Sequence, residues 1–215
     1  MKIVVNNLNK SFKNEMVINN LTYTFTSGNI YGIFGYNGSG KSVFLKILSG
    51  LYSPTSGEVL INGKNHFKDK TFCDDLGAMI EKPAFVDDLT GKENLILLSK
   101  IKNIINEEKI DNVIKIVNLL GQENKKYKKY SMGMKQKLAI AQAIMEDQKI
   151  IFLDEPFNGI DKDSIISIKN YLKSIKNDRL IIMTSHIEEN FEDLIDIYLK
   201  FEDGKIIHEK RKKDK

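Results

Sequence analysis

The order of apolar segments along this chain predicts an α/β fold with a mostly parallel sheet. Three observations support it: an alternating, β-rich start, short apolar runs of strand length, and longer segments with helical spacing between those runs. Strands that alternate with helices are typical of buried parallel sheets. We expect one 215-residue domain with a β-rich lobe, 1–81 and 141–215, and a helical lobe at about 82–140.

The first part of the chain contains most of the predicted strands. Alternating apolar residues near the N-terminus predict an antiparallel β subdomain, and Gly50 ends a predicted helix that follows a Gly-rich turn. A compact apolar run just before that turn predicts a buried strand. The predicted strands are 3–5, 21–25, 30–34, 57–61 and 76–80, and the predicted helix is 43–48.

The second part of the chain changes to helical spacing and then alternates. Apolar residues at Leu95, Leu98, Ile101 and Ile105 begin a helical stretch from Glu93 to about residue 120. The later predicted elements are helix 132–145, strand 150–153, helix 164–175, strand 180–183, helix 188–194 and strand 197–201.

Composition is that of an ordinary globular protein, with 41% hydrophobic and 29% charged residues and a net charge of +4. No apolar run approaches the ~20 residues that span a bilayer, so we expect a cytoplasmic chain unless a partner holds it at a membrane. Cys73 is the only cysteine, which excludes an internal disulfide. Lysines cluster at 125–137 and 205–215. Because Arg179 and Arg211 are the only arginines, we expect solvated surface or weak attraction to anionic lipid, and no nucleic-acid partner.

A glycine-rich segment matches the pattern G-x-x-x-x-G-K-[ST] between a predicted strand and a predicted helix. Glycines allow backbone N–H groups to surround phosphate oxygens, and the helix N-terminus adds positive potential. Lys41 would reach the outer phosphates and Ser42 would coordinate Mg²⁺. The residues of this phosphate loop are Gly35, Tyr36, Asn37, Gly38, Ser39, Gly40, Lys41 and Ser42.

Two further segments suit the same chemistry. The apolar strand 150–153 leads into Asp154 and Glu155, and acids at the carboxyl end of a parallel strand face the ligand crevice. Asp154 is placed to hold Mg²⁺ through water, and Glu155 to polarise an attacking water. Ser131 suits the N-cap of a helix whose start includes the small Gly133, which offers a second anion site.

With these motifs in this order, the chain resembles the ATP-binding subunits of ABC transporters over essentially its whole length. Walker A is 35–42, Walker B is 150–154, and the signature is 130–134. The resemblance implies that Phe12 stacks on adenine, that Asp161 belongs to the D-loop, and that His186 contacts the γ-phosphate. It also implies ATP contacts from Val43 and, in a second copy, from Ser131, Met132 and Gly133. Turn chemistry at Asp161, in a loop after Pro156, and core packing by Phe12 remain alternatives.

Two motifs depart from the common family pattern. Met132 and Met134 replace the usual Gly and Gln of the signature, and Glu81 stands where glutamine normally helps ligate Mg²⁺. Carboxylate is a good Mg²⁺ ligand, but it adds negative charge beside the γ-phosphate. With the stretch 89–95, Glu81 is similar to ATPases of bacitracin- and lantibiotic-type exporters. Pro83, Phe85 and Leu89 are interpreted equally as core or as a groove for a partner's helix.

The resemblance implies an ATPase that uses ATP and Mg²⁺ to power export, for example of an antimicrobial peptide or another toxic compound. The implied partners are a second ATPase subunit, with a homodimer expected, and a separate membrane permease; the implied location is the inner face of the membrane. A soluble ABC ATPase acting on ribosomes or DNA is the main alternative. Neither a second cassette nor sustained heptads support that alternative. A phosphate-loop kinase or GTPase is a third alternative, but the guanine-reading motif Asn-Lys-x-Asp is not found.

Overall fold

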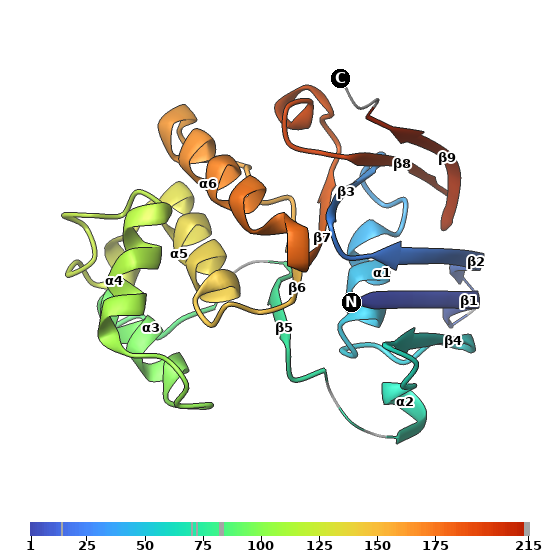
Figure 1. The fold of residues 1–215 in the computed structure, drawn as a ribbon, viewed down its shortest axis with the longest axis horizontal. Helices are drawn as coiled ribbons and strands as arrows, with labels where there is room; N and C mark the ends of the chain where they lie inside the picture. Colours follow the sequence, from blue (N-terminus) through green and yellow to red (C-terminus); the bar gives the residue numbers. More distant parts are fainter. Residues whose placement is uncertain (14, 70, 72, 82–83, 213–215) are drawn as a thin grey trace.

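The computed structural model describes residues 1–13, 15–69, 71, 73–81 and 84–212, which form two sheets and their covering helices (Figure 1). The first sheet is antiparallel, in the order β2-β1-β4. The second has the order β5-β6-β7-β3-β8-β9 and is parallel except for β9. The expected α/β fold with an N-terminal antiparallel sheet is therefore confirmed. The strands are β1 Lys2–Phe12, β2 Glu15–Thr26, β3 Asn29–Phe34, β4 Ser56–Ile61, β5 Leu76–Met79, β6 Ile150–Asp154, β7 Leu180–Ser185, β8 Ile197–Glu202 and β9 Lys205–Arg211.

The central strands of the second sheet are buried on both faces. In β6, Ile150 and Phe152 belong to one hydrophobic cluster, whereas Ile151 and Leu153 belong to another. Successive side chains of a strand point to opposite faces, so an uninterrupted apolar run is required where both faces are covered. This explains why the short apolar runs of the sequence are strands rather than helix segments.

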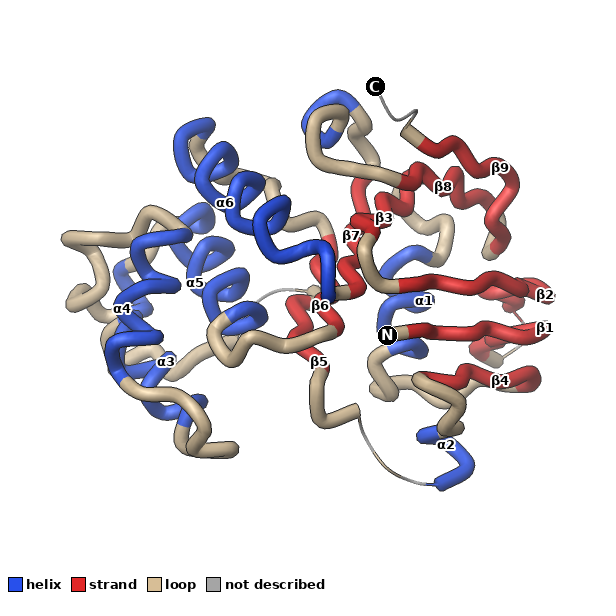
Figure 2. Tube along the Cα trace, viewed as in Figure 1, coloured by secondary structure: helices blue, strands red, loops and turns tan. Residues whose placement is uncertain are grey.

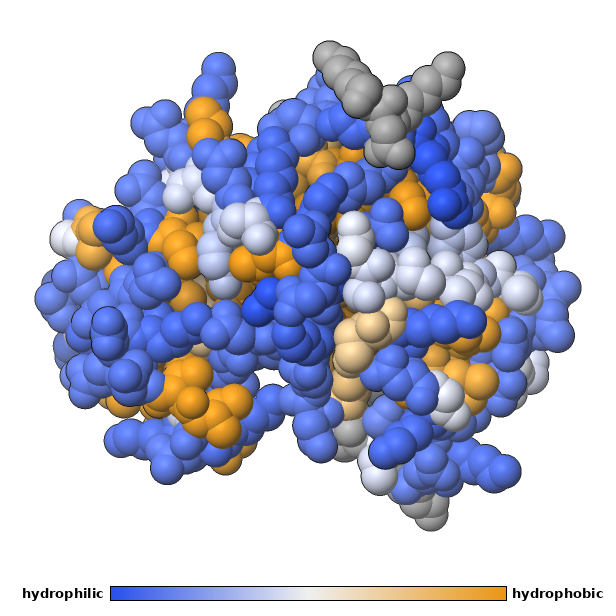
Figure 3. Space-filling view, viewed as in Figure 1, coloured by the Kyte–Doolittle hydropathy of each residue, from blue (hydrophilic) through white to orange (hydrophobic). Residues whose placement is uncertain are grey.

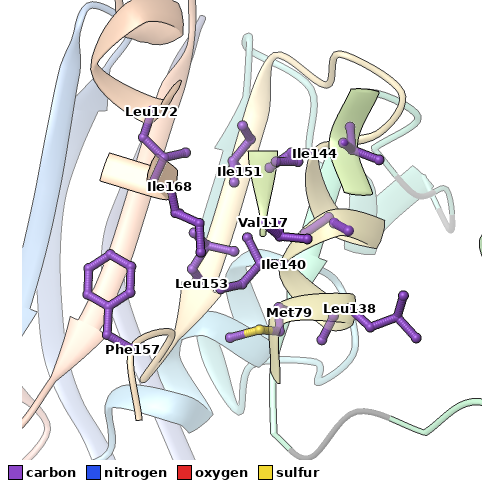
Figure 4. Packing of buried hydrophobic residues seen from close by; sticks show 14 of the residues in the cluster. Met79, Val117, Leu138, Ile140, Ile144, Ile151, Leu153, Phe157, Ile168 and Leu172 are labelled. Atoms are coloured by element: carbon purple, nitrogen blue, oxygen red, sulfur yellow. The ribbon is translucent and has the colours of Figure 1, made fainter. Parts of the chain in front are cut away.

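Helices cover the two faces of this sheet differently (Figure 2). One face packs with α1 and the antiparallel sheet, through a cluster that includes Phe44 and Phe25. The other face packs with α5 and α6, where Ile140 and Ile168 approach Leu153 from the two sides (Figure 4). The helices are α1 Lys41–Leu48, α2 His66–Asp69, α3 Gly91–Ser99, α4 Glu107–Ile116, α5 Met132–Ile144 and α6 Lys162–Ile175.

Local capping explains how the helical stretch after residue 90 is divided. α3 begins with a capping box, in which Thr90 accepts from the Glu93 N–H and the Glu93 carboxylate accepts from the Thr90 N–H. α4 begins after Asn106, whose side chain accepts from the Lys109 N–H. The single helical stretch expected from periodicity is therefore two helices, each with its own cap.

The expected helix at 188–194 is wrong. Only a 3₁₀ turn, Glu189–Phe191, forms there. The following residues must already turn into β8, since Asp196 donates its N–H to the Ile30 carbonyl and accepts from the Ile30 N–H through its carboxylate. Buried Phe191 and Leu194 supply the apolar spacing that suggested a helix.

β9 is an edge strand that the sequence analysis does not predict. It pairs antiparallel with β8, and most of its side chains are exposed. Lysines are favoured on edge strands because they discourage pairing with another chain. The composition of this lysine-rich edge strand is therefore the same as that of a solvated tail, so composition does not distinguish the two.

The molecular surface is largely hydrophilic on the face shown in Figure 3, with apolar atoms gathered in separate patches. Exposed apolar side chains include Leu97, Ile101 and Ile104 in and after α3. In the part of the chain that the structure describes, no helix has the length and apolar character needed to cross a bilayer.

Gly77 provides a test of the packing between β5 and α5. A Cβ at this position would lie 1.8 Å from the Ala143 carbonyl oxygen, so the backbones must separate to accommodate it. We expect Gly77→Ala to lower the free energy of unfolding by about 2–3 kcal/mol in urea denaturation. The control is Gly63→Ala, where the Cβ would meet open space and only the left-handed backbone is strained, at about 1 kcal/mol. Equal effects of the two changes would contradict the close packing.

Candidate nucleotide site

The phosphate loop joins the carboxyl end of β3 to the start of α1 in a closely packed backbone turn. A Cβ on Gly35 would lie 2.1 Å from the Phe201 carbonyl oxygen, and one on Gly40, at φ +104°, would lie 2.8 Å from the Val17 carbonyl oxygen. Only glycine fits at these positions without moving the neighbouring strands. The turn between β8 and β9 also contacts the loop, because Gly204 donates its N–H to the Ser39 carbonyl at 3.1 Å.

Lys41 folds back over this loop. Its Nζ donates to the carbonyls of Gly35 at 2.7 Å and Tyr36 at 2.9 Å. Burial lowers the pKa of the Lys41 ammonium, and the carboxylates of Glu155 and Asp154 oppose that shift. Lys41 therefore lies where the phosphate loop and the acidic end of β6 meet.

Asp154 and Glu155 are held in place by the neighbouring strand. In the parallel ladder Asp154 lies opposite Thr184, whose hydroxyl donates to the Asp154 carboxylate. The same hydroxyl accepts the Glu155 N–H at 3.1 Å. Asp154 is 8% exposed, and Glu155 has φ +49°, an uncommon conformation for a non-glycine residue. Sequence reasoning did not assign this positioning role to Thr184, although its place at a strand end was visible.

His186 lies beside Glu155, just after β7. Its Nδ1 is 3.0 Å from both carboxylate oxygens of Glu155. From α5, the Gln136 side-chain amide donates to the Glu155 carbonyl at 3.0 Å. Gln136 was not among the expected site residues. The sequence offered one signal for Gln136: it follows the N-cap Ser131 by five residues and so belongs to the helix that begins at the signature.

The signature segment forms the start of α5. Ser131 is the N-cap and accepts the Met134 N–H at 3.2 Å, as expected. Met132 is 70% exposed. A Cβ on Gly133 would lie 2.3 Å from the Gly159 carbonyl oxygen, so the absence of a side chain at Gly133 permits close contact with the loop after β6.

Asp161 caps α6 and is paired with a buried lysine. Its carboxylate accepts the Ser164 N–H at 2.9 Å and lies 3.2 Å from Nζ of Lys137. The hydrogen bonds from the Ser164 N–H and hydroxyl, together with Lys137, lower the pKa of Asp161 to about 2. Lys137 also donates to the Asn118 carbonyl at 3.0 Å, which ties the end of α4 to this loop.

Glu81 and Phe12 have different partners: Glu81 pairs with a lysine, and Phe12 packs on an aromatic ring. Glu81 has φ +65° and forms an ion pair with Lys46 of α1. Phe12 is 40% exposed and packs edge-on against Tyr52, with ring centroids 5.5 Å apart. Val43 lines a small cleft over the phosphate loop together with Lys41, and Phe12 is not part of that lining.

Of the expected groove residues, Pro83 lies outside the described residues. Phe85 packs on Tyr127 at 5.2 Å and is partly buried against the core, and Leu89 is partly buried. Phe85 also lines a cleft of about 930 Å³ that reaches Glu155. Both interpretations, core and groove, therefore have support at Phe85.

The three side chains expected to hold Mg²⁺ carry oxygen donors and line the same cleft. They are Ser42, Glu81 and Asp154. Mg²⁺ prefers such oxygen donors and is typically held by one or two carboxylates together with phosphate groups. Among the described residues there is no cluster of three or more His, Cys, Asp or Glu with metal-site geometry.

Comparison with known proteins gives the family. A profile described as "ABC transporter" matches residues 18–158. The chain is 42% identical to the uncharacterized ABC transporter ATP-binding protein YybJ of Bacillus subtilis, over 95% of this chain and 94% of YybJ. It is 36% identical to the bacitracin transport ATP-binding protein BcrA of Bacillus licheniformis, over 96% of this chain and 69% of BcrA. The chain belongs to the ABC transporter family, as an ATP-binding subunit.

Two further comparisons agree with this family and with the fold, respectively. The lantibiotic transport ATP-binding protein SrtF of Streptococcus pyogenes is 33% identical over 96% of this chain and 89% of SrtF. The dimeric bacterial ABC transporter cassette MJ0796 has the same fold, with a TM-score of 0.86 at 24% identity, over 97% of this chain and 98% of that one.

The capping role of Asp161 can be separated from its ion pair. We expect Asp161→Ala to lower the free energy of unfolding by about 1 kcal/mol, because the first turn of α6 loses its side-chain acceptor. Asparagine is also a good N-cap residue, so Asp161→Asn should lower the free energy of unfolding by less than Asp161→Ala does. Urea denaturation of all three proteins measures this.

The pH dependence of these variants follows from the lowered pKa. Since the pKa of Asp161 is about 2 in the folded chain, against an ordinary 3.8, its contribution is complete above about pH 4 and is lost as the pH falls towards 2. The stability difference between the wild type and Asp161→Ala should therefore shrink over that range. A difference that stays constant down to pH 2 would contradict the assignment.

Proposed function

We propose that this chain hydrolyses ATP and thereby powers export through a separate membrane subunit. The observation that carries the proposal is the convergence of Lys41, Asp154, Glu155 and His186 at the carboxyl ends of adjacent parallel strands. In open α/β sheets this edge is where ligands bind. The relatives BcrA, a bacitracin transport ATP-binding protein, and SrtF, a lantibiotic transport ATP-binding protein, support a peptide or another toxic compound as the exported substrate.

In this proposal each residue has a defined task. The phosphate loop and Lys41 bind the phosphates of ATP, and the buried Ser39 hydroxyl, which has no protein partner among the described residues, is available to them. Ser42, Asp154 and Glu81 would hold Mg²⁺, which neutralises phosphate charge when bound. Glu155 accepts a proton from the attacking water, and its backbone is fixed by Thr184 and Gln136. His186 contacts the γ-phosphate, Phe12 stacks on adenine, and Val43 adds a contact to the nucleotide.

The proposed assembly is a head-to-tail homodimer at the inner face of the membrane. Ser131, Met132 and Gly133 of one copy would complete the nucleotide site of the other, with Asp161 at the interface between them. The exposure of Met132 is compatible with such a contact. The helical lobe at about 82–140 would pass the motion to the permease, and the exposed apolar side chains after α3 suit a partner there.

Glu155→Gln tests the general base. The amide keeps the shape of the side chain but cannot accept the proton, so we expect ATP hydrolysis to fall at least about a hundredfold while ATP binding is retained. We also expect an ATP-dependent dimer, because the nucleotide is no longer consumed. Phosphate release and size-exclusion chromatography with ATP measure these effects. Glu189→Gln, at an exposed position outside the site, is the control. Hydrolysis by Glu155→Gln at the wild-type rate would refute the assignment.

Purification of a tagged chain from detergent-solubilised membranes tests the transport function. We expect the chain to sediment with membranes and to bring down a polytopic membrane protein. A chain that stays in the soluble fraction, or that co-purifies with ribosomes or DNA, would refute the transporter role and favour a soluble ABC ATPase.

A further inference from the structure

Lys46 is a charged side chain of α1 that the phosphate loop motif does not include. It lies one helical turn after Ser42 and therefore on the same side of α1. Its side chain is only 12% exposed, and Nζ forms an ion pair with Glu81. Nζ also lies 4.8 Å from the centroid of the Tyr52 ring and 3.4 Å from the Tyr52 hydroxyl. Lys46 is thus held in one place by three contacts.

Glu81 comes to Lys46 from the loop after β5, 35 positions away in the sequence. Its side chain is 63% exposed, and among the described residues the ion pair with Lys46 holds its carboxylate. The same carboxylate belongs to the cleft lined by Ser42 and Asp154. Glu81 is therefore paired with Lys46 and also lines the cleft in which a divalent cation would bind.

We propose that Lys46 is a positioning residue that holds the Glu81 carboxylate against α1 and competes for it with the divalent cation of the nucleotide site. The inference rests on the proposed ATP-binding function and deepens it. A carboxylate oxygen that accepts a hydrogen bond from an ammonium group is less available to a cation, since both positive groups are attracted to the same oxygen lone pairs. Lys46 contacts Oε1 of Glu81, so a cation that uses this oxygen must displace the lysine, and one that uses Oε2 meets a carboxylate whose charge is already partly neutralised.

The competition has a measurable size. An ion pair with one largely exposed partner, here Glu81, contributes little, and its loss changes an equilibrium by about threefold to fivefold. Removing the lysine should therefore tighten cation binding by this factor, and only while position 81 is a carboxylate. A general effect of removing one positive charge would instead be seen with glutamine at position 81 as well.

A double-mutant cycle separates the two explanations. The variants are Lys46→Met, Glu81→Gln and their combination, because methionine keeps an apolar stem that packs on Tyr52. Mn²⁺ binding is titrated by electron paramagnetic resonance in the presence of a non-hydrolysable ATP analogue. Lys92→Met is the matched control, since it removes a lysine that pairs with Asp111 at 2.6 Å in the α3–α4 region. Thermal unfolding of each variant establishes that it is folded.

We expect Lys46→Met to lower the half-saturating Mn²⁺ concentration threefold to fivefold and Lys92→Met to leave it unchanged. In the Glu81→Gln background, Lys46→Met should have no effect. An unchanged Mn²⁺ affinity in Lys46→Met would overturn the proposal, as would an equal shift with and without Glu81. If the wild-type chain fails to bind the ATP analogue, with or without Mn²⁺, the proposed function itself is wrong. Normal analogue binding with no Lys46 effect refutes only the competition.

Discussion

The parallel register of β3, β7 and β6 is the constraint on which the site depends. Phe34 lies opposite Ser185, and Asp154 lies opposite Thr184, so the three strands end at one level. The phosphate loop begins immediately after Phe34, and both acids follow from β6. A shift of one strand by one residue would exchange its two faces and separate these groups. The burial of both faces, by helices on one side and by α1 with the antiparallel sheet on the other, fixes this register.

The start of α5 is tied to the site by side chains on consecutive positions. Gln136 donates to the carbonyl of Glu155, whereas Lys137 reaches Asp161 and the end of α4. Gly133 permits the close approach of the loop after β6. Because these contacts connect helices to the backbone of an acidic residue with positive φ, displacement of α5 must be felt at Glu155. The proposed transfer of motion between the helices and the nucleotide therefore has a physical route through α5.

The sequence predicted what depends on local patterns and missed what depends on distant partners. The phosphate loop and the strand ending at Asp154 could be predicted, because their local backbone geometry requires glycines, a lysine and an apolar run at fixed spacing. The helix at 188–194 was wrong, since periodic burial of Phe191 and Leu194 arises in a turn that leads into β8. Thr184 and Lys46 could not be assigned, because their partners are 30 and 35 residues away in the chain. Only the folded arrangement brings these pairs together.

Charge balance explains why α1 carries two lysines. The lining of the cleft contains the acids Glu81, Asp87, Asp154 and Glu155 and the base Lys135. From α1, Lys46 pairs with Glu81, and Lys41 interacts with Glu155 and Asp154. Lys41 is committed to the loop carbonyls and to the acids at the end of β6, so it cannot also neutralise Glu81. Without Lys46, a carboxylate at position 81 would repel the phosphates that the loop is built to bind. A lysine one turn beyond Ser42 thus makes a glutamate tolerable at this edge of the sheet, and it does so from the same helix that begins the phosphate site.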